Sequence, residues 1–158
     1  MTLLPTDTQA LTSENNRRPL RFAILGTGYW ARYQLAAWRE IGSAECVAPY
    51  NRTRSRAEAI AAEVGVPHVY DDPKRLLAET RLDFVDVITS VDAHAPMVRL
   101  AAAHGLPVIC QKPMATSLEE AQEMVRVTEG ARVPFFVHEK WRWQTPSGRC
   151  IGCSGAGR

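Results

Sequence analysis

The sequence predicts an α/β fold in which helices cover both faces of a doubly wound, mostly parallel sheet. Short apolar runs alternate with helical patterns from Arg21 onward, and glycine–proline pairs end several helices just before the next apolar run. Right-handed crossovers between parallel strands place helices on both faces of such a sheet. Ligands bind these folds at the carboxyl ends of the strands, so functional residues are expected directly after each apolar run.

Six short apolar runs are the expected strands. In chain order, with the third the weakest, they cover residues 22–25, 46–50, 66–70, 84–88, 108–110 and 135–137. Pro49 falls within the second run, which is expected in the sheet interior, where a proline removes a ladder hydrogen bond. We therefore expect this strand to be short or bulged before Tyr50.

Two helices follow from apolar residues spaced as on one helix face. These residues are Ala57, Ile60, Ala61 and Val64 in the first helix and Leu118, Ala121, Met124 and Val125 in the second. Ser117 and Glu120 match a capping box, which predicts the start of the second helix. Gly65, Gly105 and Gly130 each precede a proline and predict helix ends, because glycine readily adopts the left-handed conformation after a last turn.

Length and composition limit the domain organisation. The 158 residues suit about one compact domain, and 46% hydrophobic with 23% charged residues is typical of an ordinary globular protein. We interpret residues 1–19 as a flexible arm, residues 20–144 as the folded domain and residues 145–158 as an atypical, disordered tail. The tail has one large apolar residue, Ile151, which buries too little surface to offset the entropy of ordering.

Charge and cysteine content argue against several functions. A net charge of +2 is too small to gather nucleic acid or an anionic membrane surface, and no apolar stretch is long enough for a spanning helix. The four cysteines form no dense disulfide framework and no secretion signal is visible, which favours a cytoplasmic location. Cys150 and Cys153 form a lone C-x-x-C pair, half a zinc site at most, so no metal centre is expected.

The most informative motif directly follows the first expected strand. A G-x-G-x-x-A pattern is formed by Gly26, Thr27, Gly28, Tyr29, Trp30 and Ala31. The first glycine permits a tight turn, the second lets a pyrophosphate approach the backbone, and the alanine lets the helix pack closely on the strand. With the free N–H groups of the helix N-terminus, this turn predicts a dinucleotide site formed by residues 26–30. The alternative is a tight turn without a ligand.

The second expected strand is followed by Asn51, Arg52, Thr53 and Arg54 rather than by the carboxylate that binds an NAD ribose. Arginines at a helix N-terminus oppose the helix dipole unless an anion binds there too. We interpret this segment as a site for the 2′-phosphate of NADP, bound by Arg52 or Arg54 with Asn51 or Thr53 donating hydrogen bonds. NAD, held through Asn51, and a solvated arginine cluster are the alternatives.

Further candidates follow the later strands. Thr89 and Ser90 lie where the crevice edge is expected and could contact the nicotinamide ribose, although helix capping is an equal alternative. His94, in the first turn of the next helix, is either a cofactor-binding residue or a half-exposed surface histidine. Lys112 is the candidate catalytic residue, because a lysine held by Pro113 at a strand end could hydrogen-bond a substrate hydroxyl or carbonyl. Its alternative is a lysine that simply reaches solvent.

After the last expected strand, two tryptophans flank Arg142. They could pack on one another, or they could cover the cofactor pocket with Arg142 positioned by a cation–π contact. The sequence does not choose between these two interpretations.

Together these motifs resemble the N-terminal domain of the glucose-fructose oxidoreductase, inositol dehydrogenase and rhizopine-catabolism (Gfo/Idh/MocA) family. The resemblance covers about residues 20–144 and rests on Ile24 to Ala31, on Val87 to Ser90 with His94, on Gln111-Lys112-Pro113 and on Trp141-Arg142-Trp143. It implies a Rossmann-type fold, a nicotinamide cofactor and a sugar, polyol or related hydroxyl compound as substrate. It also implies that Lys112, with Gln111 beside it, lies near the nicotinamide.

The sequence departs from the family at three points. Gln111 stands where the family has glutamate, and Thr89-Ser90 stands where many members have Thr-Pro. The family's second α/β domain, which supplies a catalytic histidine and most substrate contacts, has no counterpart in this sequence. We therefore expect a truncated or frame-shifted product that binds the cofactor with negligible turnover. A non-catalytic nucleotide-sensing or protein-interaction module is the alternative, and a domain that binds an adenosine-containing methyl donor is a third hypothesis.

Overall fold

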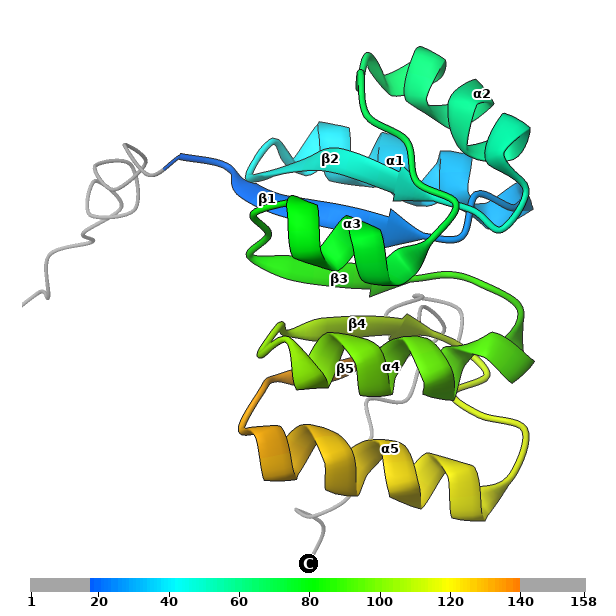
Figure 1. Cartoon of the computed structure of the whole chain (residues 1–158), viewed down its shortest axis with the longest axis vertical. Coiled ribbons are helices and arrows are strands. Elements are labelled where there is room, and N and C mark those ends of the chain that lie inside the picture. The colour runs from blue at the N-terminus through cyan, green and yellow to red at the C-terminus, as the bar shows by residue number, and fades with distance from the viewer. Residues whose placement is uncertain (1–17, 140–158) are drawn as a thin grey trace, which may run out of the picture.

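The computed structural model describes residues 18–139, and these form a five-stranded sheet with all strands parallel, in the order β2-β1-β3-β4-β5 (Figure 1). The elements are β1 (Leu20–Leu25), α1 (Tyr29–Ile41), β2 (Ala44–Tyr50), α2 (Arg54–Val64), α3 (Pro73–Glu79), β3 (Phe84–Val87), the 3₁₀ turn η1 (Val91–Ala93), α4 (His94–Ala103), β4 (Val108–Gln111), α5 (Leu118–Ala131) and β5 (Phe135–His138).

Both faces of the sheet are covered, which confirms the doubly wound α/β prediction. Along β1, Phe22 and Ile24 face one apolar cluster with α1 and α2, whereas Ala23 and Leu25 face a second cluster with α3, α4 and α5. All four side chains are fully buried, as expected for a central parallel strand. Figure 1 shows α3 and α4 in front of the strands and α1 behind them.

The face that carries α1 is open near β5. A groove of about 410 Å³, lined mainly by apolar side chains, lies between α1 and the strands β4 and β5. Ile41 of α1 and Phe136 of β5 line it and are 62% and 60% exposed. Trp30 and Tyr33 lie on the α1 side of the same groove.

The prediction of a strand at residues 66–70 is wrong. Of this segment only Tyr70 pairs, through one isolated parallel bridge to Tyr50, and its N–H donates to the Pro49 carbonyl at 3.1 Å. The chain then turns into α3, which the sequence analysis missed. This helix is short and is marked only by its start, where the Asp72 carboxylate accepts a hydrogen bond from the Lys74 N–H at 2.8 Å and proline occupies the first turn.

The predicted bulge in the strand that contains Pro49 is confirmed, but the expected interior position of this strand is wrong. β2 lies at the edge of the sheet, where a missing N–H is tolerated because one side of the strand has no ladder. The register with β1 shifts between Phe22, opposite Cys46, and Ala23, opposite Ala48. One extra residue therefore lies between these pairs, and the strand keeps its full length of seven residues.

Two of the three predicted helix ends are confirmed. Gly65 ends α2 with φ 76°, and Gly105 follows α4 with φ 68°. Gly130 does not end α5: the helix continues to Ala131, and Arg132 adopts the left-handed conformation with φ 56°. A glycine is accommodated within a last helical turn, and the Arg132 N–H closes this turn by donating to the Glu129 carbonyl at 2.9 Å.

The capping box at the start of α5 is confirmed in part. The Ser117 hydroxyl accepts from the Glu120 N–H at 3.2 Å, but the Glu120 carboxylate accepts from the N–H of Thr116 rather than from that of Ser117. The predicted apolar face is confirmed at Met124 but wrong at two positions, because Leu118 is 68% exposed and Val125 is 38% exposed. α5 packs mainly against α4, so only a narrow stripe that includes Met124 is buried.

Arg18 belongs to the segment expected to be a flexible arm. Its guanidinium donates to both carboxylate oxygens of Asp83, at 2.7 and 2.8 Å, just before β3. The remainder of that arm, the expected tail at 145–158, Arg142 and the Cys150–Cys153 pair lie outside the described residues.

Candidate functional site

The glycine turn lies between β1 and α1, at the carboxyl edge of the sheet. Gly26 has φ 109°, and a Cβ at this position would lie 2.7 Å from the main chain of Ile88 and Thr89. Gly28 precedes α1, and a Cβ there would meet nothing within 4 Å, so its main chain faces open space. Ala31 is fully buried against the sheet, which confirms its predicted packing role.

The N-terminus of α1 adjoins the glycine turn and lacks a side-chain cap. Gly28 offers no side chain to cap it, and no acidic residue lies in the first turn. The first N–H groups of a helix lack partners within the helix and carry a partial positive charge. An anion at this end would therefore be stabilised by several main-chain donors at once.

Asn51 connects the glycine turn to the end of β2. Its side-chain Nδ2 donates to the Thr27 Oγ1 at 2.8 Å, and its Oδ1 accepts from the Thr53 N–H at 2.9 Å. The Gly26 N–H donates to the Tyr50 carbonyl at 2.9 Å. Side-chain and main-chain bonds thus fix the two loops relative to each other.

A cavity of about 330 Å³ opens beside these loops. Its lining comes from the carboxyl ends of β1, β2 and β3 and from the start of α4, and comprises Gly26, Thr27, Gly28, Tyr50, Asn51, Arg52, Thr53, Arg56, Ile88, Thr89, Ser90, Asp92, Ala93 and Met97. A larger cavity of about 500 Å³ lies at the opposite ends of β1 and β2, beside Arg21 and Glu45, away from the glycine turn. We take the smaller cavity as the candidate site because it combines open main-chain donors with charged side chains.

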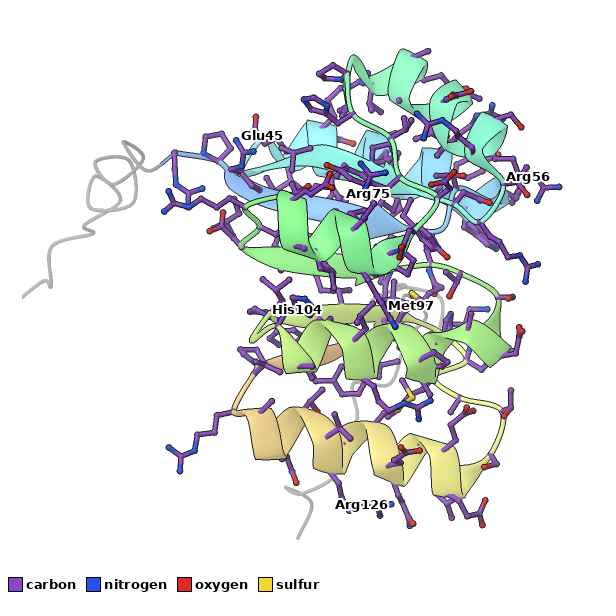
Figure 2. All side chains as sticks on the ribbon, viewed as in Figure 1. Glu45, Arg56, Arg75, Met97, His104 and Arg126 are labelled. Atoms are coloured by element: carbon purple, nitrogen blue, oxygen red, sulfur yellow. The ribbon has the colours of Figure 1, made fainter. Side chains whose placement is uncertain are left out.

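The structure separates the arginines that follow β2. Arg52 and Arg56 line the cavity. Arg54 turns away, donating to Glu58 at 3.0 Å and lying 3.9 Å from Asp71. Figure 2 shows Arg56 on the side of the molecule toward which the strands point. The sequence analysis chose Arg54 and missed Arg56, because the position on α2 that faces the crevice depends on where the helix begins.

Asp92 is a second lining residue that the sequence analysis missed. A hydrogen bond from Ser90 is the main cause that lowers the pKa of the Asp92 carboxyl, and the positive charge of Arg52 contributes. Thr89 also lines this wall, and its Oγ1 is buried without a hydrogen-bond partner among the described residues. The cavity wall therefore offers a carboxylate and an unsatisfied hydroxyl next to Ser90.

His94 does not line the cavity. Its ring is buried, with 1% exposure, and both nitrogens contact main-chain carbonyls. Tyr29 and Trp30 are also away from the cavity. The Tyr29 ring is 72% exposed beside Tyr33, and Trp30 lines the groove between α1 and β5. Tyr29 instead lines a neighbouring hollow together with Gly28 and Arg56.

Lys112 is exposed at the end of β4, and the bond to Pro113 is cis. Among residues 18–139 its ammonium forms no salt bridge with a carboxylate. Gln111 is directed to the α1 face: its Nε2 donates to Gln34 at 3.3 Å, and its Oε1 accepts from the Lys112 N–H at 2.8 Å. Gln111 thus holds the main chain of Lys112 instead of facing the cavity.

Asp86 lies beneath this contact in the centre of the sheet. Gln34 donates to both of its oxygens and the Trp38 indole to one, each at 2.8 Å. Burial raises the pKa of the Asp86 carboxyl, whereas the hydrogen bonds from Trp38 and Gln34 act in the opposite direction. Gln34 Oε1 also lies 3.0 Å from a ring nitrogen of His138, so a buried polar network joins α1 to β3 and β5.

A glycine turn, an open helix N-terminus and a cavity at the carboxyl ends of parallel strands define a dinucleotide-binding domain of the Rossmann type. The chain belongs to the Gfo/Idh/MocA family, whose model, an oxidoreductase family with an NAD-binding Rossmann fold, matches residues 20–139. The fold and family expected from the sequence are confirmed.

Known proteins with similar sequences include two sugar dehydrogenases. D-apiose dehydrogenase of Rhizobium rhizogenes is 41% identical over 131 residues, which are 83% of this chain and 38% of that protein. D-xylose 1-dehydrogenase (NADP(+)) 2 of Haloferax volcanii is 34% identical over 114 residues, 72% of this chain and 35% of that protein.

A similar solved structure is that of an oxidoreductase from Agrobacterium radiobacter in complex with NAD+, L-tartaric acid and magnesium. It is 42% identical with a TM-score of 0.78, and the match covers 80% of this chain and 37% of that chain. The chain therefore spans between 35% and 38% of the length of these three proteins.

Residues 18–139 contain neither a candidate membrane-spanning helix nor a candidate metal centre. No helix among them is both long and apolar enough to cross a membrane. No group of three or more histidine, cysteine or acidic side chains among them is placed to hold a metal ion.

Proposed function

We propose that this chain binds a nicotinamide dinucleotide, with NADP preferred over NAD, as the cofactor domain of an oxidoreductase that acts on a sugar, polyol or related hydroxyl compound. The observation that carries the proposal is the glycine turn, where the open main chain at Gly28, just before the uncapped N-terminus of α1, lines the 330 Å³ cavity. A diphosphate is the group that such main-chain donors stabilise best.

The residues around the cavity fit the cofactor. The turn around Thr27 and Gly28 offers main-chain donors to the pyrophosphate. Gly26, whose own N–H donates to Tyr50, leaves no room for a side chain. The buried Oγ1 of Thr89 lacks a partner within the described chain, and a ribose hydroxyl would satisfy it. Asp92 supplies a hydrogen-bond acceptor on the same wall.

The preference for NADP rests on charge. No carboxylate follows β2 directly, and Arg52 and Arg56 bring two guanidinium groups to the cavity. These groups suit a 2′-phosphate, with Asn51 and Thr53 as further contacts. The NADP(+) in the name of the Haloferax volcanii relative supports this choice, and the NAD+ bound in the Agrobacterium radiobacter structure supports the alternative.

When bound, the nicotinamide accepts or donates a hydride. Lys112, exposed at the end of β4, is the group of this chain that could hydrogen-bond a substrate oxygen and stabilise charge there. Substrates of the apiose and xylose kind are suggested by the names of the relatives. Because the chain covers little more than a third of those proteins, we propose cofactor binding with negligible turnover by the chain itself. A cytoplasmic location and the absence of a nucleic-acid partner stay predictions.

Calorimetric titration of the purified chain with NADPH, NADH and S-adenosylmethionine tests this proposal. We expect NADPH to bind more tightly than NADH, and the methyl donor not to bind. Binding of neither dinucleotide, or tighter binding of the methyl donor, would overturn the proposal. Tighter binding of NADH would overturn only the preference for the phosphorylated cofactor.

A further inference from the structure

One buried imidazole connects the loops that follow two neighbouring strands. The Nδ1 of His94 lies 3.1 Å from the Pro113 carbonyl oxygen and 3.3 Å from that of Met114, and its Nε2 lies 3.2 Å from the Thr89 carbonyl oxygen. Thr89 follows β3 and Pro113 follows β4. His94 therefore spans the carboxyl edge of the sheet where the candidate site begins.

The strands themselves do not hold these loops together. Pairing between β3 and β4 ends at Val87 and Cys110, before the main chain reaches either Thr89 or Pro113. Past this point, the His94 ring lies between the two segments. Because both partners are carbonyl oxygens, the ring donates to both segments at once when each of its nitrogens carries a proton. Because the ring is 1% exposed, water competes little for these contacts, and each is worth more than it would be at the surface.

The main chain of Lys112 is held from the α1 face of the sheet, opposite the face on which His94 lies. The Gln111 side chain accepts a hydrogen bond from the Lys112 N–H at 2.8 Å and is itself bound to Gln34. His94 contacts the next carbonyl along the chain, that of Pro113. The segment that presents Lys112 is therefore held at two successive residues. Among the hydrogen bonds of residues 18–139, only the one from His94 also links this segment to Thr89.

We propose that His94 is a positioning residue that sets the spacing between the Thr89 loop and the Lys112 loop and thereby orients the nicotinamide half of the cofactor. The inference rests on the proposed function. His94 does not touch the cofactor, because its ring is buried and lies outside the cavity lining. In the proposed binding mode the adenosine half would lie beside Asn51 and Arg52, which line the cavity and which His94 does not contact.

The test compares whole cofactors with their adenosine halves. The Kd of the chain is measured for NADPH against 2′,5′-ADP, and for NADH against ADP, in wild type, His94→Phe and His94→Gln. Phenylalanine keeps a ring of similar size without polar atoms, whereas glutamine keeps an N–H donor. We expect His94→Phe to raise the Kd for the whole cofactor about tenfold while the adenosine half binds as in wild type, and His94→Gln to recover part of the loss.

Three results would overturn the inference. The Kd for the whole cofactor could stay unchanged in His94→Phe, the Kd values for the whole cofactor and its half could rise equally, or His94→Gln could bind no better than His94→Phe. Failure of the proposed function is distinct, because the wild-type chain would then bind neither NADPH nor NADH.

Discussion

The side chain of Asn51 donates a hydrogen bond to the Thr27 hydroxyl at 2.8 Å, and this contact joins the end of β2 to the glycine turn after β1. In the usual NAD site the residue at the end of the second strand is an acid that binds the ribose. Here an amide occupies that place and orients the turn, while Arg52 and Arg56 supply the charge. The loops that would hold the two ends of the adenosine diphosphate are thus connected directly.

Replacing Asn51 tests this connection. Asn51→Ala removes the bond to Thr27 and the acceptor for the Thr53 N–H, so we expect the Kd for NADPH to rise about 5- to 10-fold. Asn51→Asp keeps the acceptor but places a carboxylate near the 2′ position, so we expect NADH to bind better than NADPH in this variant. An unchanged ratio of the two Kd values in Asn51→Asp would show that residue 51 does not face the 2′ position.

Substitutions of the two arginines that flank Thr53 provide a test and its matched control. Arg52→Ala removes a guanidinium from the cavity, and we expect the Kd for NADPH to rise about 10- to 30-fold with little change for NADH. Arg54→Ala is the control. Because Arg54 pairs with Glu58, this substitution should leave both Kd values nearly unchanged. Equal effects of the two substitutions would contradict the assignment of the phosphate to Arg52.

Substitutions of the two glycines of the turn should have different effects, one on stability and the other on cofactor binding. Gly26→Ala places a Cβ 2.7 Å from the main chain of Ile88 at φ 109°, and we expect it to lower the free energy of unfolding by about 3 kcal/mol. Gly28→Ala meets no neighbouring atom, so we expect a change in that free energy within about 1 kcal/mol but a Kd for the dinucleotide raised at least about tenfold.

Thermal denaturation and a cofactor titration of both glycine variants separate these effects. Wild-type affinity in a folded Gly28→Ala chain would show that the pyrophosphate does not approach this turn.

The ion pair before β3 predicts a pH dependence of stability. Hydrogen bonds from Arg18 and from the Arg21 N–H lower the pKa of the Asp83 carboxyl from 3.8 to about 2. A folded-state pKa below the unfolded value stabilises the fold above about pH 4, and this contribution is lost as the pH falls toward 2. With a discount for partial exposure, we expect Asp83→Asn to cost about 1 kcal/mol at pH 7.

Urea denaturation of wild type and Asp83→Asn from pH 7 down to pH 2 measures that contribution. The difference in free energy of unfolding should shrink as the pH drops below 4. A difference that is constant with pH would mean that the charge of Asp83 contributes nothing.

Local patterns were sufficient to predict the fold class and the glycine turn. The positions of Gly26 and Gly28 follow from a strand, a turn and a helix that are adjacent in the chain, so their roles are visible in the sequence. The edge position of the strand with Pro49 depends on the order of strands in the sheet, which no local pattern specifies. The short helix α3 was missed for a similar reason, since its burial comes from distant elements.

The candidate site was harder to predict than the fold. His94 and Gln111 were expected to bind the cofactor, yet their partners are residues far along the chain, such as Pro113 for His94 and Gln34 for Gln111. Arg54 and Arg56 differ by two positions on a helix, and only the exact start of α2 decides which one faces the crevice. Residue types at strand ends therefore predicted which loops line the cavity but not which side chains do so.

The most direct test of the central claim is an amide-resolved NMR titration of the ¹⁵N-labelled chain with NADPH. We expect the largest chemical-shift changes on the amides of residues 26–30 and on those of Asn51 and Arg52, which lie at the cavity. Changes confined to the groove between α1 and β5, or the absence of any change at the glycine turn, would contradict it.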